Sequence, residues 1–509
     1  MTKSAPGPAL AAARLRPGLA EVLVALACFA VLCGAALARP VKLLEPDDYA
    51  YRASIVALTE GNVRLTEGQY KDLALYLREQ DARAGLRASQ GIAQWTQLAG
   101  GARISEKNPG YPVLAAPFAA AGVVRLAPLL YGGLGCLALF AGGRRWLGAW
   151  GGTFAVGLFC SSGAALSFAW RVWMPTFTGA ALIAAGAGAL LWAALAGEAR
   201  SRWRVVAGLL GFLALEAAML VRYTDAVALA VALVAVLAVW RFAPGSLPRR
   251  ALAWWLGSAV LAVALVLAWN ALVYGGATAT GYASGVVAFG LGAINGNLDR
   301  MPRLLVETMP ACLLALASLV WMIGRSLWLR RTAPEGEVRP SRAAAHRDLA
   351  VAAALTAAWW GMWALYFTYY WTAMGGGPGG AGGPMGAGLP GGMGPLGGVG
   401  GSGPAGAGNA VHLVRFFVPA LAPIALLGAW ALVRLPRWVG LAAVAAFFGL
   451  GLWSYADMTA ADARGGIMGG MPGGPGGLPG GAPPGGGMPG GSPPSGAPTP
   501  QGMPSPPGQ

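Results

Sequence analysis

The feature that most constrains this chain is a series of long apolar runs separated by short polar segments. A helix needs roughly 20 apolar residues to cross a bilayer. Only 11% of the 509 residues are charged, whereas soluble domains carry about 25%. The sequence therefore predicts an all-α, polytopic membrane protein. We expect eleven spans, at about 19–38, 126–143, 150–168, 174–196, 205–221, 224–240, 251–273, 305–324, 349–371, 414–433 and 438–455.

The basic residues of the chain fall mainly on one predicted face of the membrane. With the N-terminus in the cytoplasm, the cytoplasmic segments hold 19 basic residues and only four acidic ones. This is the positive-inside asymmetry of membrane proteins. The basic residues are Lys3, Arg14, Arg16, Arg144, Arg145, Arg200, Arg202, Arg204, Arg241, Arg249, Arg250, Arg325, Arg330, Arg331, Arg339, Arg342, Arg347, Arg434 and Arg437. We therefore expect a multi-pass cell-membrane protein with an extracytoplasmic C-terminal tail, and the net charge of +16 does not predict a nucleic-acid partner.

The first apolar run is expected to remain as a permanent anchor. It extends from Val22 to Ala38 and exceeds the apolar region of a typical signal peptide, although Ala36-Leu37-Ala38 weakly resembles a cleavage site. All five cysteines lie inside apolar runs, where we expect small buried side chains and no disulfide framework. They are Cys28, Cys33, Cys136, Cys160 and Cys312.

Residues 39–111 form the one large loop predicted outside the cytoplasm. The loop holds ten basic and nine acidic residues, nearly half of the 20 acids in the chain. Apolar residues recur at helical spacing in two stripes that begin at Tyr51 and Tyr70. Two amphipathic helices that lie on the membrane surface are predicted here.

Two segments are defined by composition alone. Residues 375–408 are more than half glycine and carry no charge, and residues 465–509 repeat Gly, Met and Pro after the last span. Neither segment has enough apolar side chains to offset its backbone entropy. Both are expected to be disordered and without a catalytic role, which leaves residues 1–464 as the transmembrane domain.

An acidic pair, Asp47-Asp48, follows the first span in the stretch "LLEPDDYAYR". One interpretation is helix capping, because an Asp after Pro46 can bond the free N–H groups of a helix that starts near Ala50. Other charged residues are predicted at the same membrane face, namely Glu106, Lys107, Arg222, Asp225, His412 and Arg415. Each Arg is equally compatible with snorkelling to the lipid headgroups.

Taken together, these side chains suit group transfer from a phosphate. A carboxylate can accept the proton of a hydroxyl nucleophile. Arg and Lys can hold a phosphate and stabilise the charge that develops as it leaves. The membrane surface is where a lipid-linked phosphate is found, so the pattern favours transfer from a lipid phosphate to an acceptor hydroxyl.

The order of these motifs resembles the GT-C superfamily of membrane glycosyltransferases, in particular the bacterial protein O-mannosyltransferase and aminoarabinose transferase-like family. The acidic pair and tyrosine of that family look like Asp47-Asp48-Tyr49, and its Lys-x-Pro-Gly-Tyr-Pro stretch looks like Lys107–Pro112. Its Arg-x-Thr element is similar to Arg222–Asp225, and its Asn followed by Gly-Tyr is similar to Asn270–Tyr282. Its late Arg-Tyr-x-x-Pro element resembles Arg415–Pro419, with Phe in place of Tyr.

The resemblance covers about residues 20–455 and implies a GT-C-like catalytic domain within 1–464. It implies inverting transfer of a sugar, outside the cytoplasm, from a polyprenyl-phosphate donor to an unknown glycan, lipid or protein acceptor. The resemblance implies Asp47 as the general base, and we expect Asp48, the other catalytic candidate, to orient the loop as a helix cap. The implied donor-phosphate ligands are Lys107, Arg222 and Arg415. Tyr49, Tyr111 and Tyr282 are candidate sugar or acceptor contacts, or interfacial anchors.

The sequence departs from the family where many relatives carry a second acid. Trp170–Phe177 holds none, and the two histidines, His346 and His412, are predicted on opposite faces and cannot build a His-rich zinc site. A carboxylate-bound Mg²⁺ or Mn²⁺ at the acidic pair is chemically feasible. Nothing in the sequence supports it, so no metal or cofactor is predicted.

Two other classes of function stay open at this point. A transporter or lipid flippase usually needs ionisable groups near the middle of the membrane. Glu216 is the one clear candidate for such a group, and it also lies close enough to Arg222 in sequence to pair with it. A catalytically inactive scaffold is the third reading.

Overall fold

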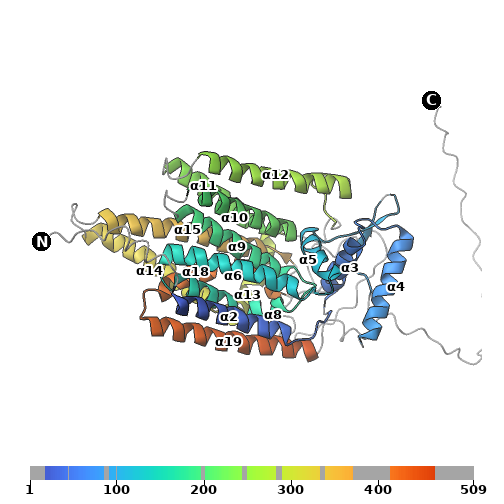
Figure 1. Ribbon diagram of the computed structural model, residues 1–509, viewed down its shortest axis with the longest axis horizontal. Coiled ribbons are helices and arrows are strands. Elements are labelled where there is room, and N and C mark those ends of the chain that lie inside the picture. The colour runs from blue at the N-terminus through green and yellow to red at the C-terminus, as the bar shows by residue number, and fades with distance from the viewer. Residues whose placement is uncertain are drawn as a thin grey trace, which may run out of the picture. The chain divides into compact units, whose positions relative to one another are not determined.

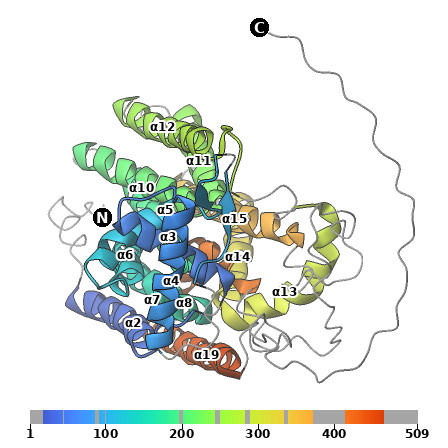
Figure 2. The same cartoon turned by 90° about the vertical axis from the view of Figure 1, so that its right-hand side faces the viewer.

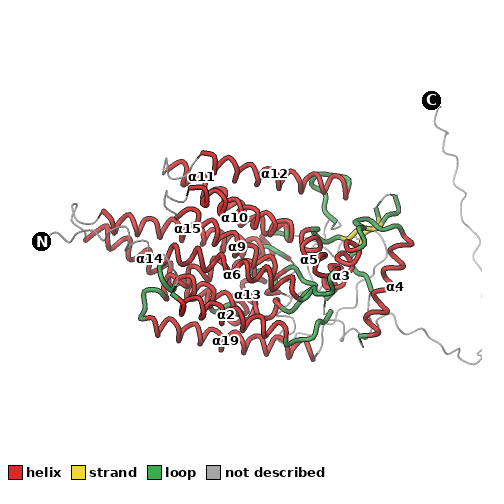
Figure 3. Tube along the Cα trace, in the orientation of Figure 1, coloured by secondary structure: helices red, strands yellow, loops and turns green. Residues whose placement is uncertain are grey.

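The computed structural model describes residues 18–43, 45–84, 91–98, 100–195, 201–242, 249–281, 289–332, 339–370 and 413–464. All of them belong to one unit within Met1–Gly470. The two glycine-rich segments, 375–408 and 465–509, and the candidate contact Tyr282 lie outside the described residues. Helices make up nearly all of the described regular structure (Figure 3).

Nine helices in the described part of the chain are long and apolar enough to cross a membrane. Their apolar side chains face outward over much of the bundle, as lipid contact requires, and Figure 1 shows them side by side. The chain is therefore a multi-pass membrane protein with an all-α bundle. The nine are α2 (Leu19–Leu37), α6 (Leu126–Leu147), α9 (Thr176–Leu195), α10 (Ser201–Val221), α11 (Ala226–Phe242), α12 (Arg249–Tyr274), α14 (Ala311–Thr332), α15 (Arg339–Phe367) and α19 (Arg437–Arg464).

The other two predicted spans differ from simple helices. The segment predicted at 150–168 is a pair of helices, α7 (Gly151–Cys160) and α8 (Gly163–Ala169), bent by 65° at its break. A side chain at Gly451 of α19 would collide with the carbonyl oxygen of Ser161 at this break, so only glycine permits that approach. The segment predicted at 414–433 is a shorter helix, α18 (Leu421–Leu432), in which every residue is buried.

The eighth predicted span begins later than the sequence indicated. Residues 305–308 belong instead to an amphipathic helix, α13 (Ile294–Thr308), and α14 starts only at Ala311. Pro310 separates the two helices, because proline lacks the N–H that a continuous helix would use. Asn297 fixes α13 to the end of α15 by donating to the carbonyl oxygens of Phe367 and Tyr369, at 2.8 and 3.1 Å.

The predicted loop 39–111 folds into α3 (Pro46–Thr59), α4 (Glu67–Arg83) and an antiparallel hairpin of β1 (Trp95–Gln97) and β2 (Arg103–Ser105) (Figure 2). It closes with the first residues of α5 (Gly110–Ala120). Both predicted helices are present, and the hairpin was not predicted. Their apolar stripes do not lie free on a surface. Tyr51 and Ile55 of the first stripe pack in the main core of the bundle, whereas the stripe that begins at Tyr70 packs against α3 and the hairpin. This second, small core consists of Ala53, Ala57, Leu65, Leu73, Leu77, Ile92 and Trp95.

The two ends of the bundle carry different charged groups. At one end, Asp348 of α15 accepts hydrogen bonds from Trp146 of α6 and Trp430 of α18, and Glu21 of α2 pairs with Arg144. We call this the Asp348 end, and it gathers basic residues that the sequence placed on one face. The opposite end, which holds α3, α4 and the hairpin in Figure 1, is called the α3 end. Which compartment each end faces stays a prediction.

Candidate functional site

The predicted acidic pair lies in the first turn of α3, at the α3 end of the bundle. Pro46 is the first residue of the helix, where proline is favoured because its missing N–H has no helical partner. The N–H of Glu45 donates to Oδ2 of Asp48 at 2.9 Å. Glu45, rather than an Asp of the pair, is therefore the N-cap, and Asp48 is the third helical residue, which bonds back to the N–H of the cap in a capping box. The helix starts four residues before the predicted Ala50.

Arg171 closes the inner side of this turn. It lies between α8 and α9, and its guanidinium bonds Oε1 of Glu45 at 2.7 Å and Oδ2 of Asp48 at 3.1 Å. All three side chains are buried, and Arg171 is only 1% exposed. Buried charges persist when they are paired and hydrogen-bonded. Arg171 thus neutralises the carboxylates that fix the start of α3.

Asp47 points to a different set of cations. Lys107 Nζ lies 2.8 Å from its Oδ1, and an Arg415 nitrogen lies 3.2 Å from its Oδ2. The same Arg415 nitrogen also pairs with Glu45, which links the Asp47 contacts to the Arg171 contacts. The Asp47 side chain is 20% exposed, unlike the fully buried Asp48. Within this cluster of three acids and three cations, Asp47 is the carboxylate that solvent or a substrate can reach.

The surroundings of Asp47 set its ionisation. Burial opposes the charged form, but attraction to Lys107 and then to Arg415 outweighs it and holds the pKa of Asp47 below its ordinary value. The neighbouring Glu106 differs, because burial raises its pKa and Lys107 only partly offsets that effect. Asp47 is therefore ionised and is a weak base while Lys107 and Arg415 are both in contact with it.

Arg222, a predicted phosphate ligand, contacts Arg415 rather than the acids. Its guanidinium donates to the backbone oxygen of Arg415 at 2.9 Å and to the hydroxyl of Tyr366 at 2.8 Å. It also lies 5.4 Å from the ring centres of Tyr366 and Phe416, within the range of cation–π attraction. In this structure Arg222 holds the backbone that carries Arg415, and its role as a phosphate ligand stays a prediction.

The predicted tyrosine contacts are more enclosed than a sugar-stacking surface would be. Tyr49 is 7% exposed and Tyr111 is fully buried. The Tyr111 hydroxyl donates to the backbone oxygen of Val172, and its ring meets Tyr51 edge-on at 5.9 Å. Tyr111 therefore ties α5 to the segment that carries Arg171, while Tyr282 lies outside the described residues.

Two members of the cluster, Glu45 and Arg171, were not predicted from the sequence. A signal for Arg171 was present, because it is the only charged residue between Arg145 and Glu198. A lone ionisable residue in an apolar region is costly unless it has a partner. Glu45 lies two residues before Asp47 and had no comparable signal.

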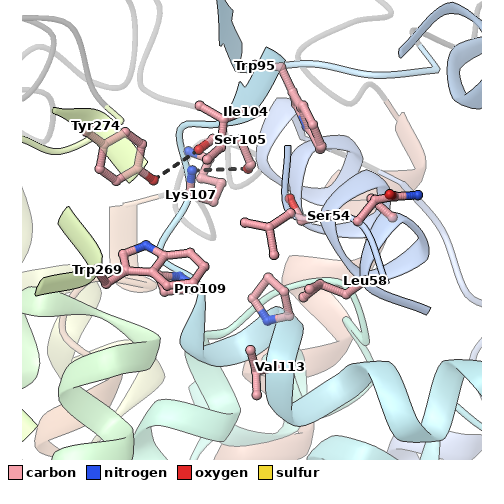
Figure 4. Close-up of a pocket in the computed structure, with 14 residues that line it drawn as sticks. Ser54, Leu58, Trp95, Ile104, Ser105, Lys107, Pro109, Val113, Trp269 and Tyr274 are labelled. Carbon is pink, nitrogen blue, oxygen red and sulfur yellow. Dashed lines mark hydrogen bonds between the residues drawn. The ribbon is translucent and has the colours of Figure 1, made fainter. Parts of the chain in front are cut away.

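A small cavity of about 40 Å³ lies beside Lys107 (Figure 4). Its walls come from α3, the β-hairpin, the start of α5 and the end of α12. The Lys107 N–H donates to the Ser105 hydroxyl at 3.2 Å, and the Tyr274 hydroxyl donates to the Ser105 carbonyl oxygen at 3.2 Å. Lys107 thus lines this cavity and also contributes its ammonium to Asp47.

Fold and site together define a multi-pass helical membrane protein with a paired acid–base cluster at one end. Among the described residues, no group of three or more His, Cys, Asp or Glu side chains is arranged to hold a metal ion. No protein-family model, curated protein or solved structure matches the chain. The geometry of the cluster is therefore the basis on which a function can be proposed.

Proposed function

We propose that this protein is an inverting glycosyltransferase that moves a sugar from a polyprenyl-phosphate donor to an acceptor hydroxyl at the extracytoplasmic face of the membrane. One observation carries the proposal: the partly exposed carboxylate of Asp47 lies between the cations of Lys107 and Arg415. These residues are distant in sequence and meet only in the fold. The reaction needs a base that accepts the proton of the acceptor hydroxyl and cations that stabilise the leaving phosphate, and this arrangement offers both.

Donor binding and activation of the base are coupled in this arrangement. The cluster has as many acids as cations, so an incoming phosphate must compete with Asp47 and Glu45 for Lys107 and Arg415. Charge-assisted hydrogen bonds to phosphate oxygens are strong enough to do so. As the cations turn to the phosphate, Asp47 loses the attractions that lower its pKa. The carboxylate then becomes a stronger base when the donor is in place.

The chemical step follows from these roles. Asp47 accepts the proton of the acceptor hydroxyl while the hydroxyl oxygen forms a bond to the anomeric carbon of the sugar. The bond from that carbon to the phosphate oxygen breaks on the opposite face, and its electron pair leaves with the polyprenyl phosphate. Lys107 and Arg415 stabilise this leaving charge. Attack from the opposite face inverts the anomeric configuration.

The test is donor turnover by the purified protein in lipid nanodiscs. Membranes lacking this protein serve as the background, and the probe is a set of radiolabelled decaprenyl-phosphate monosaccharides. We expect loss of at least one donor, with release of decaprenyl phosphate, and expect Asp47→Asn to abolish most of it. A wild-type protein that turns over none of the donors contradicts the proposal.

One observation favours the alternative of a transporter or lipid flippase. Glu216 on α10 is 5% exposed, and one of its carboxylate oxygens has no hydrogen-bond partner among the described residues. Buried acids within spans often mark ion pathways. In proteoliposomes, translocation of a fluorescent decaprenyl phosphate that is lost in Glu216→Gln, without donor turnover by the wild type, would favour this class instead.

A further inference from the structure

Arg415 makes both of its ion pairs through a single nitrogen. Its Nη1 contacts Glu45 and lies 3.2 Å from Asp47 Oδ2, and its side chain donates no other hydrogen bond to a described residue. An arginine binds a phosphate best through two parallel N–H groups, so the plane of the guanidinium must face the anion. One shared nitrogen fixes a point of that group but not its plane. Another contact must therefore orient Arg415.

The aromatic ring of Phe416 makes such a contact. The central carbon of the Arg415 guanidinium lies 4.7 Å from the ring centre, within the roughly 6 Å range of cation–π attraction. Side chains of adjacent helical residues do not face each other, whereas here the chain turns at residues 415–417. The ring also contacts Arg222, whose central carbon lies 5.4 Å from its centre. The two cations therefore share one ring.

Two tyrosines hold this ring in place. Tyr366 lies 5.2 Å from Phe416 between ring centres, and Tyr369 lies 5.2 Å from it in an edge-on arrangement. Aromatic pairs at these separations attract each other. The Tyr366 hydroxyl also accepts the hydrogen bond from Arg222, which in turn bonds the backbone of Arg415. Phe416 is thus a fixed surface against which the Arg415 guanidinium rests.

The ring contact matters because the acids compete with a phosphate for Arg415. A guanidinium that can turn freely can present a second nitrogen to Glu45 and Asp47, and it is then lost to a ligand. The attraction to Phe416 opposes that turn. A ligand that needs one conformation binds more weakly in proportion to the fraction of molecules that lack it. The ring therefore raises the affinity for a phosphate without touching it.

We infer that Phe416 is a positioning residue for the donor phosphate, because its ring orients the guanidinium of Arg415 and also holds Arg222. The ring face, rather than any polar atom, carries this role. The inference rests on the proposed function for its choice of ligand.

Fluorination of the ring separates this role from simple packing. A cation is attracted to the negative face of an aromatic ring. Fluorine atoms withdraw electron density from that face and change the size of the ring little. A residue that only fills space is insensitive to this change, whereas a ring that orients two cations loses its effect stepwise.

The test is equilibrium binding of decaprenyl phosphate to the full-length protein in lipid nanodiscs. Phe416 is replaced by mono-, di- and trifluorophenylalanine, and thermal unfolding confirms that each protein is folded. We expect the affinity to fall with each added fluorine. Phe416→Leu should bind roughly 3- to 10-fold more weakly than wild type, as expected for the loss of one to two cation–π contacts. Phe416→Tyr keeps the ring and should bind like the wild type.

Phe289 provides the matched control. It stacks on Tyr369 at 4.9 Å in the same group of aromatic rings, and among the described residues no cation lies over its ring. The fluorinated series at Phe289 should leave the affinity unchanged. A second control tests the route of the effect, because fluorination of Phe416 should lose most of its effect in Arg415→Ala protein.

An affinity that does not follow the number of fluorines at Phe416 overturns the inference. Equal trends at Phe416 and Phe289 also overturn it, and so does a trend that persists unchanged in Arg415→Ala protein. A wild type that binds no decaprenyl phosphate overturns both this inference and the proposed donor. A fluorine trend without donor turnover keeps the positioning role and removes the transferase, whereas turnover without the trend does the reverse.

Discussion

The two ends of the bundle bury acids in opposite ways. Asp348 accepts hydrogen bonds from Trp146 and Trp430 at 3.1 Å each and from Arg434 at 3.2 Å, an Arg347 nitrogen lies 3.8 Å from it, and its side chain is 10% exposed. At the α3 end, Asp47 has two cations and a side chain that is 20% exposed. The Asp348 carboxylate, whose oxygens are all bonded to other helices, holds those helices together. The Asp47 carboxylate is more exposed, and its two cations can transfer to a bound phosphate, so it can take part in chemistry.

The largest expected difference between the two ends is in turnover. Asp47→Asn keeps the size of the side chain but cannot accept a proton, so we expect donor turnover to fall roughly 10²–10⁴-fold. Asp348→Asn makes the same chemical change at the other end and should leave turnover per folded molecule near that of the wild type. Turnover of labelled donor, normalised to the folded fraction, measures both. Equal losses of turnover in the two variants would show that Asp47 has no catalytic role that Asp348 lacks.

Arg171→Leu tests whether the buried contacts of Arg171 with Glu45 and Asp48 stabilise the α3 end. It removes the cation that pairs with buried Asp48 and one of the two cations that pair with Glu45, for which we expect a loss of about 3–5 kcal/mol of stability. Reversible unfolding in mixed micelles measures the loss. The triple variant with Glu45→Gln and Asp48→Asn should recover much of it, because no buried charge is then left unpaired. A single variant as stable as wild type would show that the pair contributes nothing to the fold.

Arg415→Ala and Lys107→Ala each remove one cation from the proposed phosphate position. A hydrogen bond to a charged group contributes about 1.5–3 kcal/mol, which corresponds to a roughly 10- to 100-fold weaker affinity for the donor. Equilibrium binding of decaprenyl-phosphate sugar measures it, with Arg434→Ala at the Asp348 end as the matched control. Unchanged affinity in both α3-end variants would place the phosphate elsewhere.

The smallest expected effect is in the pH dependence. The carboxylate form of Asp47 is the base, so kcat/KM should decline as the pH falls through the pKa of Asp47 in the free enzyme. Lys107 and Arg415 hold that pKa below its ordinary value despite burial. The decline of kcat/KM on the acid side of the pH profile should therefore have its midpoint below about pH 3.9. Lys107→Ala should move the limb upward. A limb that stays in place would mean that another group titrates.

The sequence alone determined the class of the protein and most of its helices. Apolar runs of the length of a bilayer crossing are local features, and so is the helical spacing that located α3 and α4. Arg144, Arg347 and Arg434, which were predicted on one face, lie together at the Asp348 end. The acidic pair was also found from its local context, because two adjacent carboxylates are unusual in so apolar a chain.

Tertiary structure decided the partners of those carboxylates. Arg171 and Arg415 bond Glu45 from 126 and 370 residues away, and no periodicity in a single chain encodes such separations. The same holds for Trp95 and Trp269, which share a cavity only because the hairpin meets the end of α12. Local patterns fix helices through bonds between near neighbours. Ion pairs and cavities depend instead on how whole elements pack, and for that reason the structure alone separates the reachable Asp47 from the buried Asp48.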